Sequence, residues 1–409
     1  MNKKLKVLAS ILTTVVIAGT FAGCGKQTGN TAASADKKHE SKEITVWSHL
    51  NENEVAEVKK AAEEWAKKTG NTVKVQRDQS SFQAYLQAAN SSKAPDIMFG
   101  IAHDNLGTFH KAGLLAEVPD GTIDKSKYVE STLDAVSYDG KMYGIPVSME
   151  TYALFYNTEK VKSAPETLDD LIAQAQKVGF QYDINNFYFS YAFVAGNGGY
   201  VFKNNGGALD PKDIGLGNEG AVKAYQLLAD FTQKYKFMPA TIKGDDAKAN
   251  FQKGKIGLYI SGPWDVDGFK KAGTKFAVAP LPSVNGKACP SFMGVQAAFV
   301  NSKSKNQTEA WDLMKYLAEN TSEPLFKAGS RIPVLKAELE KDDVKSNAIF
   351  TAFAKQSENA EPMPNISEMA AVWTPAGDNL TLITQGKLKP ADAGKQITQQ
   401  ITQGIAQQK

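Results

Sequence analysis

The sequence predicts an α/β protein of two lobes with a ligand cleft between them, and three observations lead to this prediction. The 409 residues exceed the length of one ordinary domain, so two is the natural number. Near the N-terminus, strand and helix patterns follow one another in the order β-α-β-α-β, which is typical of a mainly parallel sheet flanked by helices. The stretch 144–157 then alternates in the manner of extended chain, with a change of phase at Glu150 and Thr151.

That change of phase predicts a bend or break between two strand segments, so that one long strand serves both lobes. The chain before it is long enough for one α/β lobe, and another begins after it. A charge at Glu150 would be costly if it were buried without a partner. We therefore expect Glu150 to face the cleft.

The first 23 residues have the pattern of a secretory signal peptide, with lysines at positions 3, 4 and 6 followed by the apolar run 7–23. The segment Phe21-Ala22-Gly23-Cys24 resembles the bacterial lipoprotein box, which usually has leucine where Phe21 stands. The resemblance implies cleavage before Cys24 and acylation of that cysteine; the alternative is an ordinary secretory peptide with a cysteine near its end. Acyl chains would tether the protein to a membrane surface without a spanning helix in the mature chain.

A flexible tether is expected over residues 24–43, because this stretch is rich in Gly, Ser, Thr, Ala and Lys. Cys289 is the only other cysteine, so it cannot form an internal disulfide if Cys24 is lipidated. No histidine or acidic motif lies near Cys289. A small buried residue is the expected role, rather than a nucleophile.

The first lobe is expected to begin with strands and helices in strict alternation. Strands are predicted at 43–47, 72–75 and 96–100, and helices at 55–68 and 81–90, the first of them ending at a Gly70 C-cap. In a parallel sheet, ligands bind beyond the carboxyl ends of the strands. The residues 47–49 and 100–105 lie at such ends.

Further elements of both lobes are expected after the crossing strand. Helices are predicted at 168–178, 219–235, 309–317 and 335–340 and from Pro390, and strands at 256–260 and 276–279. The stretch 294–301 alternates again and is interpreted as a second crossing between lobes. The first lobe would take residues 44–148 and 298–343, and the second 149–297 and 344–409.

Charge and motifs exclude several classes of function. The three lysines before Cys24 account for the whole net charge of +3, which argues against a nucleic-acid binder. We find no phosphate-binding loop, no dinucleotide fingerprint and no Gly-x-Ser-x-Gly elbow. The four histidines form no close metal pair. No cofactor, metal or catalytic residue is predicted, and a binding protein is favoured over an enzyme.

Aromatic and polar residues gather where predicted elements end. Trp47, Trp264 and Trp373 each lie at the end of a predicted strand or segment. Further aromatic rings cluster at 187–191, beside several asparagines. Sugars present flat apolar faces that stack on rings, and hydroxyls that donate to carboxylates and amides. A cleft with both kinds of side chain suits an oligosaccharide.

Several segments are similar to the maltose/maltodextrin-binding proteins of ABC importers. They are Pro95-Asp96-Ile97-Met98-Phe99 with Ala102-His103-Asp104, the segment 113–117, the stretch 146–157, the segment 198–203, Gly262-Pro263-Trp264, and 363–369 ending at Trp373. These matches run in order over nearly the whole chain from about residue 44. The resemblance implies a periplasmic-binding-protein-like fold, with two α/β lobes joined by crossing segments and closing over a sugar.

The resemblance also implies roles for individual residues. Asp104 and Glu150 match carboxylates that accept bonds from sugar hydroxyls, and Trp264 and Trp373 match rings that stack on glucose. With the flanking positions, the candidate sugar-binding residues are Asp104, Asn105, Glu150, Tyr188, Phe189, Tyr191, Trp264, Met363 and Trp373. This chain departs from the pattern at Gly100-Ile101, where many relatives have a tryptophan, and at Asn105 and Gly377, where an arginine is common.

The sequence therefore predicts a monomeric, lipid-anchored binding protein on the extracellular face of a bacterial membrane. It would capture maltose and maltodextrins and deliver them to the permease subunits of an ABC importer, with a separate ATPase. The first alternative is a binding protein for another oligosaccharide of similar shape. The second is a secreted glycosidase that uses Asp104 and Glu150.

Overall fold

The structure is a computed structural model that describes residues 40–80, 82–206 and 208–408. The described residues from Ser41 onward form one compact unit. The predicted signal peptide, the acylated Cys24 and most of the predicted tether therefore lie outside the described residues. Among the described helices, none is both long and apolar enough to cross a membrane.

The first five elements have the predicted order. They are β1 (Glu43–Ser48), α1 (Glu52–Thr69), β2 (Thr72–Arg77), α2 (Phe82–Ala89) and β3 (Ile97–Ala102). The central strand β1 pairs in parallel with both β2 and β3. Helix α1 ends at Gly70, whose φ of 73° is the left-handed conformation expected of a C-cap glycine.

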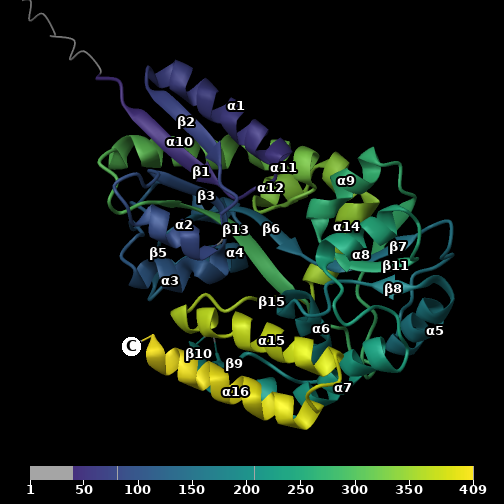
Figure 1. The fold of residues 1–409 in the computed structure, drawn as a ribbon. Helices are drawn as coiled ribbons and strands as arrows, with labels where there is room; N and C mark the ends of the chain where they lie inside the picture. The colour runs from purple at the N-terminus through teal and green to yellow at the C-terminus, as the bar shows by residue number, and fades with distance from the viewer. Residues whose placement is uncertain (1–39, 81, 207, 409) are drawn as a thin grey trace, which may run out of the picture. The chain divides into compact units, whose positions relative to one another are not determined.

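The predicted break in the crossing strand is present. Strand β6 (Ile145–Thr151) is buried along its whole length, and Tyr152 separates it from β7 (Ala153–Asn157). The two segments belong to different sheets, β6 to one of seven strands and β7 to one of four. The change of phase in the sequence marks the point at which the chain leaves one sheet and enters the other (Figure 1).

Both sheets are mixed, so the prediction that each is mainly parallel is wrong. The large sheet has the order β14-β6-β13-β3-β1-β2, with β15 paired to β13, and the small one has the order β12-β7-β11-β8. Strand β13 (Phe292–Val300) lies antiparallel to both β3 and β6. The physical reason is that β6 leads out of the large sheet while β13 runs back into it, so the two neighbours point in opposite directions.

The other strands complete the sheets. They are β4 (Ser137–Tyr138), β5 (Lys141–Met142), β8 (Phe180–Gln181), β9 (Phe202–Asn205), β10 (Ala208–Ile214), β11 (Leu258–Ser261), β12 (Phe276–Ala279), β14 (Ile332–Pro333) and β15 (Glu361–Pro362). Strands β9 and β10 form a separate hairpin, as do β4 and β5.

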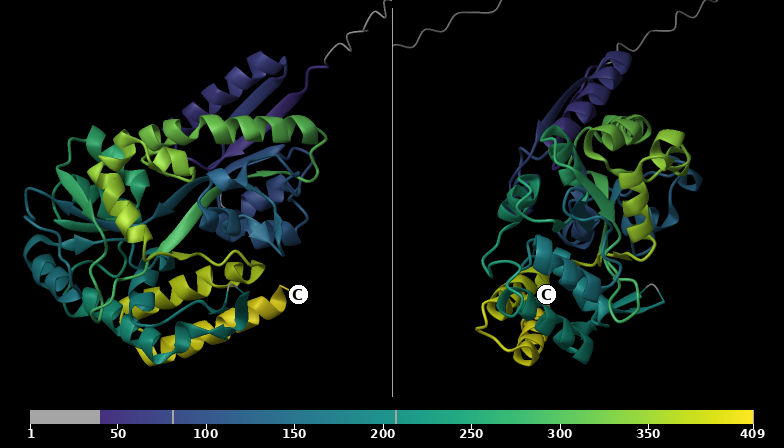
Figure 2. Two further views of the ribbon diagram at one scale, coloured as in Figure 1. Left: turned by 180° about the vertical axis from the view of Figure 1, so that it is seen from behind. Right: turned by 90° about the vertical axis from the view of Figure 1, so that its right-hand side faces the viewer.

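Helices pack around both sheets and also against one another. They are α3 (Leu106–Lys111), α4 (Glu130–Ala135), α5 (Leu168–Val178), α6 (Phe187–Gly196), α7 (Glu219–Gln233), α8 (Gly244–Gln252), α9 (Val266–Lys271), α10 (Gln307–Asn320), α11 (Ser322–Gly329), α12 (Lys336–Leu339), α13 (Asp342–Lys345), α14 (Ala348–Ser357), α15 (Trp373–Thr384) and α16 (Pro390–Gln407). The last two lie side by side and pack on α7 (Figures 1 and 2). Cys289 is buried and unpaired, as expected of a structural residue.

Candidate functional site

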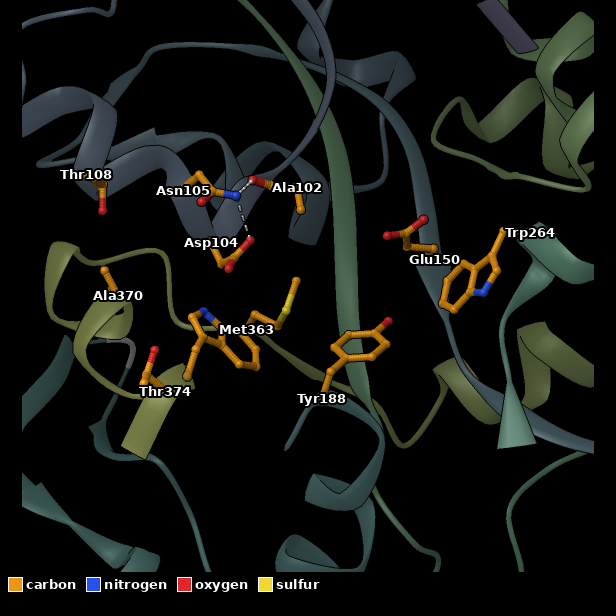
Figure 3. Close-up of a pocket in the computed structure, with 11 residues that line it drawn as sticks. Ala102, Asp104, Asn105, Thr108, Glu150, Tyr188, Trp264, Met363, Ala370 and Thr374 are labelled. Carbon is orange, nitrogen blue, oxygen red and sulfur yellow. Dashed lines mark hydrogen bonds between the residues drawn. The ribbon is translucent and has the colours of Figure 1, made fainter. Parts of the chain in front are cut away.

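A cavity of about 530 Å³ opens where the crossing strands meet α6 and α15 (Figure 3). It is lined by Ala102, Asp104, Asn105, Thr108, Glu150, Tyr188, Trp264, Met363, Ala370, Trp373 and Thr374. Seven of the nine predicted site residues are among them. The sequence did not predict the other four lining residues, although each lies within four positions of a predicted one. They are Ala102, Thr108, Ala370 and Thr374.

Asp104 and Asn105 are carried into the cavity by the turn that follows β3. The amide nitrogen Nδ2 of Asn105 donates to the carbonyl oxygen of Ala102 at 2.9 Å and to Oδ1 of Asp104 at 3.2 Å. Both side chains therefore have a fixed direction at the carboxyl end of a parallel strand. Such a turn presents one charged and one neutral acceptor to a ligand.

Burial raises the pKa of the Asp104 carboxyl to about 7. A hydrogen bond from the Trp373 side chain works against this rise, and the nearby charge of Glu150 adds to it. The side chain is partly exposed to the cavity. Asp104 is therefore a largely buried acceptor, held by Asn105 and Trp373, whose remaining lone pairs can accept from ligand hydroxyl groups.

Asp104 should make the empty protein less stable above neutral pH. Its pKa is higher in the folded state than the ordinary value of 3.8, so its contribution to stability is complete below about pH 4 and is lost as pH rises through 7. Asp104→Asn should therefore raise the free energy of unfolding at pH 8 by about 1–3 kcal/mol, after allowance for solvent screening. Denaturant titrations at pH 4 and pH 8 would measure this difference. An equal effect at both pH values would contradict it, and the exposed Asp120→Asn is the matched control.

His103 lies directly behind Asp104 and is completely buried. Its Nδ1 accepts from the backbone nitrogen of Val295 on β13, and its Nε2 donates to the carbonyl oxygen of Met363, each at 3.0 Å. Burial lowers the pKa of this histidine from 6.5 to about 4. The neutral ring thus links the turn after β3 to β13 and to the segment of Met363, which lines the cavity.

Glu150 lines the cavity from β6 but is only 8 % exposed. Gln296 donates to its Oε1 at 2.7 Å, and Nη1 of Arg331 donates to its Oε2. We expected Glu150 to face a crevice because a buried charge needs a partner. In the structure Glu150 lines the cavity and is also almost buried beside such a partner. The charge is nearly buried and has a cationic partner, and one edge still reaches the cavity.

Three aromatic rings and one thioether form the apolar walls. Trp373 begins α15 and meets Phe292 edge to face, with ring centroids 6.0 Å apart. The ring of Trp264 folds back over Gly262, where an added Cβ would lie 2.2 Å from the indole. Only glycine permits that close approach. Tyr188 and Met363 complete the walls, so flat apolar faces surround the two carboxylates (Figure 3).

Two predicted residues do not line this cavity. Tyr191 is 2 % exposed and stacks on Phe292 with ring centroids 3.7 Å apart. Phe189 packs against Tyr152 instead, with ring centroids 5.4 Å apart. All three aromatic candidates near residue 190 lie on α6. The helix turns Phe189 away from Tyr188, and the stacking of Tyr191 on Phe292 withdraws that ring from the cavity. Only Tyr188 lies on the side that faces the cavity.

A second cavity of about 560 Å³ adjoins the first and shares Ala102, Asn105, Glu150 and Trp264 with it. Its other walls carry charged and polar groups, including His49, Lys248, Asp265 and Arg331. Lys248 and Asp265 form an ion pair at 2.6 Å. No group of three or more metal-ligating side chains occurs in the described part of the chain. The two cavities together suit a long, neutral and hydroxyl-rich ligand.

The chain is similar to several known proteins over most of its length. The family model described as bacterial extracellular solute-binding protein matches residues 60–352. The galactooligosaccharide-binding protein of Bacillus subtilis is 30% identical, over 96% of this chain and 95% of its own. A maltooligosaccharide ABC transporter solute-binding lipoprotein of Streptococcus pneumoniae is 31% identical, over 100% of this chain and 99% of its own. The solved maltose-maltodextrin binding protein of Alicyclobacillus acidocaldarius is 42% identical, with a TM-score of 0.85 over 88% of this chain and 100% of its own.

Proposed function

The chain belongs to the family of bacterial extracellular solute-binding proteins, and we propose that it captures maltose and maltodextrins for an ABC importer. The single observation that carries the proposal is the cavity itself, in which Trp264, Trp373 and Tyr188 surround the acceptors Asp104 and Glu150. Rings stack on sugar faces, and carboxylates accept from sugar hydroxyls. The relatives named for malto-oligosaccharides support the same ligand class.

We propose that the protein is anchored to the extracellular membrane face and delivers sugar to permease subunits. The signal-like N-terminus, the lipoprotein-like segment ending at Cys24 and the lipoprotein among the relatives support a lipid anchor on the extracellular membrane face. A monomer would deliver sugar to the permease subunits. Cys24→Ser should release the protein from the membrane fraction, and retention there would count against the anchor.

We also propose that the two sheets are the cores of two lobes with the predicted bounds, 44–148 with 298–343 and 149–297 with 344–409. Strands β6 and β13 and the segment after β15 pass beside the cavity, so ligand would touch both lobes at once. Binding of that kind favours a closed arrangement, because the ligand gains contacts only when the lobes approach.

A galacto-oligosaccharide is the second candidate ligand, because one relative that matches nearly the whole chain is named for that sugar. Both ligands offer hydroxyls and flat faces, but their linkages place those faces differently. The hydrolytic alternative has no support from the family, and Glu150 is already held by Gln296 and Arg331.

Calorimetric titration with maltotriose and with a galactotriose tests the proposal. We expect micromolar or tighter binding of maltotriose, weaker binding of the galactose trimer, and intact sugar recovered afterwards. Tight binding of the galactose trimer alone would favour the second candidate. Release of glucose from maltotriose would establish hydrolysis and contradict a pure binding role.

A further inference from the structure

A buried ion-pair network forms part of the wall of the second cavity, and its member Glu150 lines both cavities. Arg331 precedes β14 and is only 6 % exposed. Its Nε donates to Oε1 of Glu54 at 2.5 Å, and its Nη2 donates to Oε2 of the same carboxylate at 3.2 Å. Its Nη1 donates to Oε2 of Glu150. One guanidinium thus joins the start of α1 to the crossing strand β6.

This network leaves Glu150 almost no freedom. Gln296 holds the other oxygen of the carboxylate at 2.7 Å. A Cβ added at Gly294 would lie 3.0 Å from Cγ of Glu150, so the side chain is also confined by the β13 backbone. An acceptor fixed at both oxygens offers its remaining lone pairs in set directions. Such an acceptor discriminates between ligand hydroxyls by their geometry.

The backbone before Arg331 is shaped to admit the network. A Cβ added at Gly329 would lie 1.9 Å from Oε1 of Glu54, so only glycine leaves room for that carboxylate. Ser330 adopts a left-handed φ of 54°, which is uncommon for serine. Glu54 also accepts from the backbone nitrogen of Asn51 at 2.7 Å. Glu54 is thus held firmly and in turn fixes the guanidinium.

We propose that Arg331 is a positioning residue that sets the orientation of Glu150 for sugar binding. The inference rests on the proposed function, and Arg331 acts through Glu150 rather than as the main sugar contact. Two carboxylates share one guanidinium, so the cluster keeps one net negative charge and Glu150 stays an acceptor. Without Arg331, the carboxylate would lose its partner on Oε2 and could turn away from the cavity. Arginine suits this task because its planar fork engages both carboxylates at once.

A double-mutant cycle separates positioning from a general structural role. Arg331→Met keeps an apolar stem of similar length and should weaken maltotriose binding tenfold to a hundredfold. In the Glu150→Gln background, Arg331→Met should lower the affinity for maltotriose less than twofold. The reason is that the carboxylate through which Arg331 acts is already missing. Lys327→Met, the matched control, removes an exposed cation that pairs with Glu323 outside the network, and its binding should stay within threefold of wild type. Equal losses in both backgrounds would overturn the proposal.

A second experiment remains informative if Arg331→Met does not fold or if neither sugar binds. It uses a double variant and its crystal structure. Arg331→Met with Glu54→Gln removes one charge of each sign, so it should fold even if the single variant does not. Its crystal structure should show the Glu150 carboxylate turned away from Gln296, whereas an unchanged Glu150 would overturn the proposal. If wild type binds neither sugar trimer, the proposed function fails, while this structural comparison still decides the positioning role.

Discussion

Trp373→Ala is expected to weaken maltodextrin binding by about tenfold to a hundredfold. Stacking a glucose face on the indole removes some 50–100 Å² of apolar surface from water, which corresponds to roughly 1–3 kcal/mol. The hydrogen bond from the Trp373 side chain to Asp104 would be lost as well. Calorimetric titration of the variant with maltotriose measures the change in affinity.

Stability should change much less than affinity in this variant. Trp373 is half-buried and touches Phe187 and Phe292 only through edge-to-face contacts. We expect a loss of about 1–2 kcal/mol, below the 3–5 kcal/mol typical of a core tryptophan. Trp373→Phe is the matched control, since it keeps a ring and should retain most of the affinity. A collapsed melting temperature with unchanged affinity would show that Trp373 is a core residue and not a sugar platform.

His103→Phe is expected to destabilise the protein by about 2–4 kcal/mol at neutral pH. A phenyl ring fills the same space but leaves the backbone nitrogen of Val295 and the carbonyl oxygen of Met363 without their partner. Each buried polar group left unpaired costs about 1–3 kcal/mol. His103→Gln, which keeps one donor and one acceptor, should lose less. Denaturant unfolding at pH 7.5 measures all three proteins.

The same variant should also change the pH dependence of stability. The pKa of His103 is lower in the folded protein than the ordinary 6.5, so its contribution is present above pH 6.5 and is lost as pH falls to about 4. That contribution amounts to about 3 kcal/mol, and His103→Phe should lack it. Asp104 acts in the opposite sense over much of this range, so only the difference between variant and wild type is informative. A constant difference from pH 7.5 to pH 4 would contradict the account.

Local signals in the sequence predicted the parts of the fold that depend on neighbouring residues. The change of phase at Glu150 is such a signal, and the structure places the strand break at Tyr152. The carboxyl end of a predicted strand marked the stretch 100–105, and the resemblance to sugar-binding proteins singled out Asp104 within it. The directions of β6 and β13 depend on connections more than a hundred residues long, so the mixed character of the sheets was not visible in the sequence.

The same distinction explains the site residues that were missed or misplaced. Tyr188 and Tyr191 are three positions apart on α6, and only the tertiary contact with Phe292 decides which of them faces the cavity. Arg331 is 181 positions from Glu150 and has no local motif. A single sequence offers no signal that would pair two such residues.

A crystal structure of the protein with maltotriose tests the central claim most directly. The account predicts a glucose ring against the Trp373 indole, hydroxyl groups within hydrogen-bond distance of Asp104 and Glu150, and two lobes closer together than in crystals without sugar. Sugar bound away from the cavity lined by Trp373 and Glu150, or a cavity that stays empty in crystals at saturating maltotriose, would contradict it.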